Sequence, residues 1–314
     1  MKGNVLFIDT VHPVLQFQLE QNGWSCVDGT NWKTEKVMAE LRNVSGIVIR
    51  SRFMLDAAFL KGAVQLKFIA RAGAGMENVD VAVAESMGII CLNAPEGNRN
   101  AVGEHALGML LALLNNLVNA DREVREGKWF REENRGVELD GKTVGIVGFG
   151  NTGSAFARKL SGFDVTTLAY DPYTKVDSKK FPDVKQAQME ELFLNCDILS
   201  LHVPLTTLTT QLVNDEYLSS FTKPVYLVNT SRGKVVNTTS VVKALEHGKI
   251  KGAGLDVLEF ESLSFETLSK EQQPDAFQKL RTFKNVILSP HIAGWTVESH
   301  RKISEVLAEK IIAL

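Results

Sequence analysis

Short apolar runs alternate with amphipathic patterns along nearly the whole chain. Each run suits one β-strand, and the segments between them repeat apolar residues at roughly the 3.6-residue period of a helix. Strands that alternate with helices indicate an α/β fold with parallel sheets. The runs interpreted as strands are Val5–Ile8, Gly46–Ile49, Phe68–Ala70, Ile89–Leu92, Val144–Val147, Val165–Tyr170, Ile198–Leu201, Val225–Asn229, Ala253–Val257 and Val286–Leu288. Their spacing predicts two doubly wound, Rossmann-like units, with the first ending at about residue 95.

Two long helical patterns suggest how these units are connected. Residues 100–124 carry apolar side chains at helical spacing and lie between the two groups of strands. Residues 297–314 form an amphipathic helix after the last strand, and we expect its apolar stripe to pack on the first unit. The expected domains are therefore 1–96 together with 287–314, and 97–286. A ligand cleft is expected between them, at the carboxyl ends of the strands.

Composition and charge argue against several classes of partner. Of the 314 residues, 44% are hydrophobic and 23% are charged, and the net charge of −2 gives no general attraction to nucleic acid or to an anionic membrane. No apolar stretch is pure and long enough to span a bilayer, and the first run is too short for a signal peptide. Cys26, Cys91 and Cys196 lie far apart and form no metal-ligand cluster. Reduced thiols in a cytoplasmic protein, and no bound metal, are therefore expected.

The sequence around residues 143–171 is the strongest indication of function. An apolar run enters the pattern Gly148-x-Gly150-x-x-Gly153, a helical pattern of small residues follows, and a second apolar run ends at Asp171. In dinucleotide-binding folds such glycines permit a tight turn, the approach of the backbone to a pyrophosphate and close packing of helix on strand. Asp171 is placed to bind the adenine ribose and would repel a 2′-phosphate, which favours NAD over NADP. The alternative is a purely structural βαβ turn.

Three further strand ends carry polar residues that suit a single reaction. Arg232, Glu261 and His291 each come shortly after an apolar strand. Because parallel strands bring their carboxyl ends to one crevice, these side chains are expected to meet. An arginine binds the carboxylate of a 2-oxo acid, a histidine protonates its carbonyl oxygen as hydride arrives, and a carboxylate orients the histidine. Glu259 is the second candidate for that carboxylate.

The chain resembles the D-isomer-specific 2-hydroxyacid dehydrogenases over essentially its full length. The motifs that carry the resemblance are Arg71-Ala-Gly-Ala-Gly75, Asn93-Ala-Pro-Glu-Gly-Asn98, Val102-Gly-Glu-His105, the Gly148 turn, His202-Val-Pro-Leu-Thr206, Asn229-Thr-Ser-Arg-Gly233, Gly254-Leu-Asp-Val257 and Pro290-His291-x-x-Gly294. The resemblance implies an NAD-dependent enzyme with a small hydroxy acid or oxo acid as substrate. In that enzyme Arg232 would bind the substrate, Glu261 would orient the histidine and His291 would be the acid/base.

The same resemblance implies roles for further residues. Cofactor contacts are implied for Gly148, Gly150, Asn151, Thr152, Gly153, Asp171, His202, Pro204, Thr230, Ser231, Asp256 and Gly294, with Asp256 on the nicotinamide carboxamide. Ala74 and Gly75 would offer backbone N–H groups to the substrate carboxylate, and Asn98 would line the cleft. The chain departs from the family in two features. Ser262 stands where a proline usually follows the glutamate, and the polar segment 262–284 is longer than is common.

Within the family, the N-terminal unit is most similar to the phosphoglycerate dehydrogenases. Arg50, Ser51 and Arg52 follow an apolar strand, and an extended chain would place Arg50 and Arg52 on one face, near Arg71. Three guanidinium groups suit a substrate with both a carboxylate and a phosphate, such as 3-phosphoglycerate or phosphohydroxypyruvate. The alternative is that Arg50 and Arg52 are solvated and paired with local acids.

Other functions stay open. A glyoxylate or hydroxypyruvate reductase would not need the two neighbouring arginines, and a non-enzymatic NAD-sensing protein could lose any of the three catalytic residues. The resemblance also implies a homodimer, for which the apolar pattern at 100–124 would suit the interface. No further domain follows the final helix, so feedback by serine is not expected even if the chain serves serine biosynthesis. His105 and Trp295 are explained equally well by packing or by a place beside the substrate, whereas His202 is expected to support a loop near the cofactor.

Overall fold

The computed structural model describes residues 2–262 and 274–314, which form two compact units. Unit 1 comprises residues 2–99 and 295–314, and unit 2 comprises residues 100–262 and 274–294. The expected domain limits, after residue 96 and before residue 287, stay a prediction. Much of the long polar segment singled out in the sequence, residues 263–273, lies outside the described residues.

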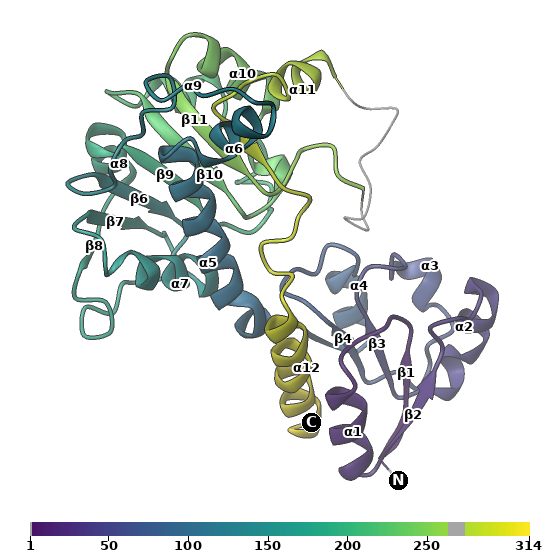
Figure 1. Ribbon diagram of the computed structural model, residues 1–314. Coiled ribbons are helices and arrows are strands. Elements are labelled where there is room, and N and C mark those ends of the chain that lie inside the picture. The colour runs from purple at the N-terminus through teal and green to yellow at the C-terminus, as the bar shows by residue number, and fades with distance from the viewer. Residues whose placement is uncertain (1, 263–273) are drawn as a thin grey trace. The chain divides into compact units, whose positions relative to one another are not determined.

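Unit 1 is built on a five-stranded parallel sheet in the order β2-β1-β3-β4-β5 (Figure 1). Its strands are β1 (Gly3–Phe7), β2 (Trp24–Asp28), β3 (Gly46–Ile49), β4 (Phe68–Arg71) and β5 (Ile90–Leu92). Its helices are α1 (Val14–Gln21), α2 (Thr34–Glu40), the 3-10 helix η1 (Leu41–Asn43), α3 (Ala57–Leu60), α4 (Val81–Ser86) and α12 (Val297–Ile312). Because β1 pairs with both β2 and β3, the winding reverses at the carboxyl ends of β1 and β3, where ligands bind in such sheets.

Apolar side chains cover both faces of this sheet. On one face Leu6 and Ile47 are fully buried with residues of the surrounding helices. On the other face Leu15 of α1 packs with Leu307 and Ile311 of α12. The last helix of the chain therefore lies beside one of the first, as its apolar stripe predicted (Figure 1).

Unit 2 carries a seven-stranded parallel sheet in the order β12-β11-β10-β9-β6-β7-β8. Its strands are β6 (Thr143–Val147), β7 (Thr166–Tyr170), β8 (Val184–Gln186), β9 (Ile198–Leu201), β10 (Val225–Asn229), β11 (Ile250–Leu255) and β12 (Val286–Leu288). Its helices are α6 (Leu117–Arg125), α7 (Asn151–Leu160), α8 (Met189–Asn195), α9 (Asp215–Ser219), the 3-10 helix η2 (Gly233–Val235), α10 (Thr238–Glu246) and α11 (Asp275–Leu280), together with most of α5 (Pro95–Leu114). Because β6 pairs with both β7 and β9, the glycine turn after β6 lies at the switch point.

The predicted α/β architecture with two parallel sheets is confirmed. Two strands, β2 and β8, are absent from the predicted runs. Both lie at a sheet edge, and most of their side chains are only half-buried or exposed, so neither needs a continuous apolar run.

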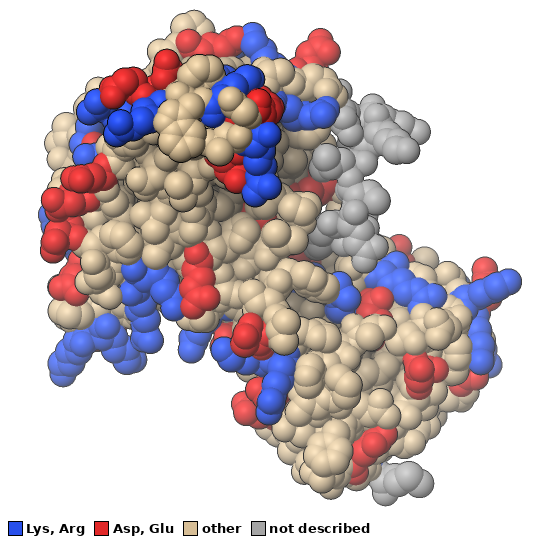
Figure 2. All heavy atoms as spheres, viewed as in Figure 1, with Lys and Arg blue, Asp and Glu red and all other residues tan. Residues whose placement is uncertain are grey.

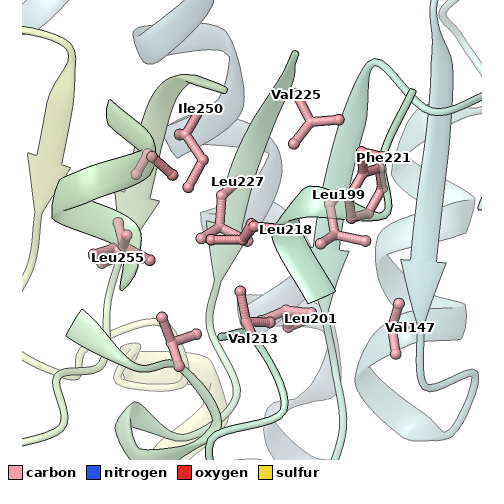
Figure 3. Close-up of a cluster of buried hydrophobic side chains, with 14 of the residues drawn as sticks. Val147, Leu199, Leu201, Val213, Leu218, Phe221, Val225, Leu227, Ile250 and Leu255 are labelled. Carbon is pink, nitrogen blue, oxygen red and sulfur yellow. The ribbon is translucent and has the colours of Figure 1, made fainter. Parts of the chain in front are cut away.

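The strands of unit 2 bury apolar side chains against the helices of one face (Figure 3). Leu199, Leu201 and Leu227 are fully buried there, and Leu218 of α9 packs against them. Full burial of one such side chain stabilises the fold by about 1.5–3 kcal/mol. This packing fixes the register of β9, β10 and β11, whose carboxyl ends carry the polar residues discussed below.

The helical pattern at 100–124 forms two helices rather than one. α5 ends at Leu114, α6 begins at Leu117, and their axes are bent by 62°. Asn116 between them has a φ of +54°, in the left-handed region that interrupts helical hydrogen bonding. No single helix in the described part of the chain is apolar and long enough to cross a membrane, and only this bent pair reaches the required length and hydropathy together.

Charged side chains of both signs are mixed over the surface. On the face shown in Figure 2, lysine and arginine side chains lie among aspartate and glutamate side chains on both units. This mixture agrees with the net charge of −2.

Candidate active site

The glycine-rich turn of unit 2 connects β6 to α7. Gly148 has a φ of +92°, and a Cβ there would lie 2.6 Å from the carbonyl oxygen of His202. A Cβ on Gly153 would lie 2.0 Å from the carbonyl oxygen of Gly148, so only a hydrogen allows the helix to approach the strand this closely. At Gly150, by contrast, no atom of the described residues other than its chain neighbours lies within 4 Å of the Cβ position. The turn is therefore packed on one side and open at Gly150, and the open side suits a phosphate group.

Asp171 ties the end of β7 to this turn. Its Oδ2 accepts the N–H of Phe149 at 2.7 Å, and its Oδ1 accepts the N–H groups of Tyr173 and Thr174, both at 2.8 Å. The contact of Asp171 with ribose stays a prediction, and it would use carboxylate lone pairs beyond these three bonds. Among the described residues no side chain caps the start of α7, at Asn151, where the helix N–H groups and dipole favour an anion.

Two buried polar atoms of unit 2 have no hydrogen-bond partner among the described residues. They are Nδ1 of His202, after β9, and Oγ1 of Thr230, after β10. Nε2 of His202 shares a hydrogen bond with Ser200 Oγ at 2.9 Å, and the ring centre lies 5.3 Å from that of Phe156. Burial lowers the pKa of His202 to about 3, so this imidazole is neutral at physiological pH. Because a buried polar atom without a partner costs about 1–3 kcal/mol, a bound ligand that pairs with these atoms fits the site.

The loop that follows β10 presents Arg232. Asn229, fully buried at the strand end, accepts hydrogen bonds from the N–H and the hydroxyl of Ser231 at 3.0 and 2.7 Å, and its amide donates to the carbonyl of Arg232 at 3.1 Å. At Gly233 a Cβ would lie 1.9 Å from the carbonyl oxygen of Leu258, so this loop packs tightly against the segment after β11. One strand-end amide therefore fixes the backbone from which the arginine projects.

His291 and Glu261 form a hydrogen-bonded pair in unit 2. Nδ1 of His291 lies 2.6 Å from Oε2 of Glu261, and both side chains are largely buried. The other carboxylate oxygen of Glu261 accepts the N–H of Leu258, which fixes its orientation. Because the carboxylate accepts the Nδ1–H, Nε2 becomes the nitrogen able to exchange a proton with a substrate. This is the orientation that an acid/base histidine requires.

Glu259, the second candidate for the partner carboxylate, faces elsewhere. Its Oε2 accepts the N–H and the hydroxyl of Thr238 at 3.0 and 2.9 Å, and its Oε1 accepts from the amide of Gln211 at 3.3 Å. It therefore anchors the start of α10, and Glu261 alone of the two contacts His291.

Asp256 holds the turn that carries His291. The carbonyl of Asp256 accepts the N–H of His291 at 2.7 Å, and its carboxylate accepts the N–H groups of Ile292 and Ala293 at 2.9 and 2.8 Å and the hydroxyl of Ser289 at 2.6 Å. His291 has a φ of +55°, a left-handed conformation that a non-glycine residue keeps only where its surroundings enforce it. Asp256 supplies that enforcement.

The support of Asp256 extends to α5. Nε2 of His105 lies 3.1 Å from Ser289 Oγ and 3.5 Å from Oδ1 of Asp256. The sequence left open whether His105 serves packing or lies beside the substrate. The contact of Asp256 with the nicotinamide carboxamide stays a prediction. Leu255 and Leu288 are register partners in the sheet, which makes the next residues, Asp256 and Ser289, neighbours; this register comes from the structure and not from the sequence.

Unit 1 offers unused donors after β4. In the described part of the chain the N–H groups of Ala74 and Gly75 make no hydrogen bond within the protein, while Asn93 holds the loop by donating to the carbonyl of Ala74 at 2.6 Å. Oδ1 of Asn98 is buried and accepts no hydrogen bond there. Backbone N–H groups of this kind bind carboxylates, so the loop fits the role that the resemblance implies.

The segment after β3 turns around Asp9 instead of continuing as extended chain. Oδ2 of Asp9 accepts the N–H groups of Arg50, Ser51 and Arg52 at 2.6, 3.0 and 3.2 Å. The prediction that Arg50 and Arg52 project from one face is wrong, because the alternation of side chains holds only for extended backbone.

The two guanidinium groups accordingly have different surroundings. That of Arg52 donates to the backbone carbonyls of Ile8, Gly29, Thr30 and Trp32. That of Arg50 lies 4.4 Å from the ring centre of Trp295. Arg71, at the end of β4, donates from Nε to the carbonyl of Arg50 at 3.1 Å. Arg52, although exposed, therefore uses its guanidinium to stabilise its own loop, whereas Arg50 is half-buried beside Trp295.

Residues 107–293 match the D-isomer specific 2-hydroxyacid dehydrogenase family in its NAD binding domain. The chain belongs to this family. It is 33% identical over 294 residues to D-3-phosphoglycerate dehydrogenase of Archaeoglobus fulgidus, and the matched region covers 94% of the chain and 54% of that relative. It is 36% identical over 285 residues to glyoxylate reductase of Thermofilum pendens, and here the matched region covers 89% of the chain and 81% of that relative. The chain thus spans about half the length of the phosphoglycerate dehydrogenases that it matches.

A solved structure of the same family has the same fold. D-lactate dehydrogenase from Aquifex aeolicus, complexed with NAD and lactic acid, superposes with a TM-score of 0.82 at 27% identity, covering 99% of this chain and 94% of that one. The cofactor residues implied by the resemblance, Gly294 excepted, fall within the matched domain. The open side of Gly150 and the unpaired atoms of His202 and Thr230 fit the NAD of this family, while each individual contact stays a prediction.

Proposed function

We propose that the chain catalyses hydride transfer between NAD and a D-2-hydroxy acid or the corresponding 2-oxo acid. The observation that carries the proposal is the 2.6 Å hydrogen bond between Glu261 and His291, on a turn fixed by Asp256. During reduction Nε2 of His291 gives a proton to the carbonyl oxygen, and during oxidation it takes the proton from the hydroxyl. Arg232 supplies a guanidinium for the substrate carboxylate. The nicotinamide, when bound, supplies or accepts the hydride.

The two neighbouring glutamates allow a matched test of this proposal. Glu261→Gln keeps the size of the side chain but removes the charge that holds Nδ1–H, so NADH-dependent reduction should slow by about 10²–10⁴-fold and should fail at a lower pH than in the parent. Glu259→Gln should leave the pH profile unchanged, because Glu259 contacts Thr238 rather than the histidine. Equal pH profiles for the parent and Glu261→Gln would refute the assignment.

We further propose that the substrate pair is 3-phosphoglycerate and phosphohydroxypyruvate, which would place the chain in serine biosynthesis. Unit 1 supports this with two kinds of anion-binding group: the N–H groups of Ala74 and Gly75 for the carboxylate, and the guanidinium of Arg50 for the phosphate. Arg52 does not contribute its guanidinium, which is bound to backbone carbonyls. Relatives named D-3-phosphoglycerate dehydrogenase point the same way.

A glyoxylate or hydroxypyruvate reductase is the second candidate, favoured by the 36% identity to the glyoxylate reductase of Thermofilum pendens. The two are separated by measuring NADH oxidation with phosphohydroxypyruvate, hydroxypyruvate and glyoxylate, in the parent and in Arg50→Ala. Arg42→Ala, an exposed arginine of η1, is the control. If the phosphorylated substrate is preferred and Arg50→Ala alone removes the preference, the first candidate stands. If NADH binds and none of the three is reduced, an NAD-sensing role replaces both.

We propose that the chain forms a homodimer through α6 and the segment after it. The apolar residues of α5 at Ala106 and Leu110 are buried within unit 2, so they are not available to a partner. Leu117, Trp129 and Phe130, by contrast, are 56%, 76% and 45% exposed. Sedimentation of the parent beside Trp129→Glu tests this, since a charge in the interface should give monomers.

We also propose a cytoplasmic location. Burial raises the pKa of Cys26 to about 11, where Glu20 adds to the effect, and raises that of Cys196 to about 12. All three cysteines are unpaired thiols, which suits a reducing compartment. Fractionation of cells with an antibody against the chain tests the location.

A further inference from the structure

The guanidinium of Arg50 lies in a group of side chains from three separate elements of unit 1. Arg50 follows β3, His12 precedes α1, Trp295 lies just before α12, and His300 lies in the first turn of α12. The ring centres of His12 and His300 are 5.5 Å apart in an edge-on arrangement, and the Arg50 guanidinium lies 4.4 Å from the ring centre of Trp295. The group gathers at the carboxyl ends of β1 and β3, the switch point of this sheet.

Within the described part of the chain, the guanidinium of Arg50 donates no hydrogen bond and forms no ion pair. Asp9, the acid on this side of the sheet, uses Oδ2 for three backbone N–H groups. Arg52, two residues on, shows the opposite arrangement, with its guanidinium bound to backbone carbonyls. The five N–H donors of Arg50, whose guanidinium lies 4.4 Å from the centre of the Trp295 ring, thus form a receptor for an anion from solution.

The two histidines lie near this receptor, because the charge of Arg50 acts on the ring of His300. Nδ1 of His12 accepts the N–H of Val14 at 3.2 Å, so Nε2 is the nitrogen of this ring that can donate to a ligand. The imidazole of His300 makes no hydrogen bond in the described part of the chain. Burial, and then the charges of His12 and Arg50, lower the pKa of His300. Without a ligand this ring is therefore neutral at neutral pH and can take up a proton when an anion arrives.

The other charged groups near His300 are directed elsewhere. On α12 itself Glu298 and Lys302 are exposed, and Arg301 pairs with Glu305 at 2.7 Å. Towards β1, the carboxylate of Asp9 holds the backbone after β3. His12 and Arg50 are thus the charged or titratable groups that set the state of His300.

We propose that Arg50, His12 and His300 form an anion subsite that binds the phosphate monoester end of the substrate and takes up a proton on His300 as it binds. The proposal rests on the proposed phosphorylated substrate. No covalent bond changes: one proton moves from solvent to the imidazole, and the resulting imidazolium donates to a phosphate oxygen. A dianion beside the ring favours its charged form, so phosphate binding and protonation strengthen each other.

The coupling has a definite sign. In the pH range where His300 is neutral in the free protein and protonated in the complex, binding takes up one proton. In that range KM for the phosphorylated substrate should rise with pH by up to about tenfold per pH unit. Between pH 7 and pH 8.5 a phosphate monoester, with its second pKa of about 6, is already a dianion. Its own titration therefore adds little to the pH dependence of KM. Hydroxypyruvate, which has no phosphate, should show no such rise.

The test observes the histidine directly, in the full chain with NADH bound. The chain has 6 histidines, so ring ¹³C labelling gives few signals, and single His→Asn variants assign them. Inorganic phosphate is the probe for the anion, and phosphohydroxypyruvate reduction is the probe for the substrate. We expect phosphate to move the titration midpoint of His300 upward by about one pH unit or more, and expect Arg50→Gln to abolish the movement. A His300 midpoint that phosphate leaves unchanged overturns the proposal.

Kinetics provide the second readout. His300→Gln keeps a neutral donor but cannot titrate, so KM for phosphohydroxypyruvate should lose its rise with pH. His247→Asn replaces an exposed histidine of unit 2, and this control should keep the rise. A pH-dependent KM that survives in His300→Gln contradicts the proposal. If phosphate moves His300 but only hydroxypyruvate or glyoxylate is reduced, the subsite stands and the phosphorylated substrate falls. If phosphohydroxypyruvate is reduced while His300 is unmoved, the function stands and the subsite falls.

Discussion

Replacing Asp256 by asparagine removes a charge from the centre of the candidate site with almost no change in shape. The carboxylate accepts three hydrogen bonds, from Ser289, Ile292 and Ala293, and its side chain has 0% exposure. An asparagine has one acceptor oxygen, so its NH₂ group must face at least one of these three donors. That donor then loses its acceptor inside the protein.

The magnitude follows from those contacts. A hydrogen bond to a charged group contributes about 1.5–3 kcal/mol, and a buried donor left without an acceptor costs about 1–3 kcal/mol. Because the two figures partly describe the same loss, we expect Asp256→Asn to lower the free energy of unfolding by about 2–4 kcal/mol. For a unit of this size that lowers Tm by about 5–15 °C. The turn that keeps His291 at a φ of +55° also relaxes, so kcat should fall by about 10²-fold or more.

The assay compares urea unfolding and NADH oxidation for the parent, Asp256→Asn and Asp183→Asn, an exposed aspartate as control. Burial of Asp256 opposes ionisation, but hydrogen bonds from the residues around it, among them His105 and Ser289, outweigh burial and hold its pKa below the usual value. A carboxyl with a lowered pKa stabilises the fold above its unfolded pKa of about 3.9 and loses this contribution as pH falls through the folded pKa. The difference between parent and variant should therefore be complete at pH 7 and shrink below about pH 4.

Two results would refute this reasoning. If Asp256→Asn unfolds like Asp183→Asn at neutral pH, the buried carboxylate does not hold the turn. If stability falls but kcat is unchanged and KM for NADH alone rises, Asp256 acts on the cofactor and not through His291.

Three further predictions follow from the same geometry. His291→Ala should reduce kcat by about 10²–10⁴-fold while NADH still binds, as fluorescence titration would show; unchanged turnover would exclude His291 as the acid/base. Asp171→Ala should weaken NADH more than NADPH in the same titration, since the carboxylate favours ribose hydroxyls over a 2′-phosphate; equal losses would exclude the ribose role. Gly153→Ala places a Cβ 2.0 Å from a backbone oxygen of Gly148, so α7 must move and stability should fall by about 1–3 kcal/mol in urea unfolding, with weaker NADH binding; a stable variant with full affinity would show that the helix need not lie so close.

Much of the fold could be predicted from the sequence because its signals are local. Buried parallel strands need apolar runs, and helices that cover them need one apolar stripe, so both appear as periodic patterns. Apolar runs do not identify the edge strands β2 and β8, because a strand with a solvent-exposed side needs no continuous apolar run. The break at Asn116 escapes it too, since the apolar period continues across a residue whose backbone has turned left-handed.

The sequence by itself also determined which residues stand at the strand ends: the Gly148 turn, Arg232, Glu261 and His291. These follow from chain order, since each comes just after an apolar run. Only the tertiary structure decided between Glu259 and Glu261, because the segment after β11 is a turn and the period of an extended chain does not apply there.

The tertiary structure likewise decided which groups the guanidiniums of Arg50 and Arg52 contact. It also brought together side chains that are remote in sequence. The Asp9 carboxylate turns the chain after β3, which sends one guanidinium to backbone carbonyls and the other to Trp295. His12 meets His300 only because α12 packs beside α1. Local patterns record what each segment must bury, whereas the partner of a polar side chain depends on where distant segments come to lie.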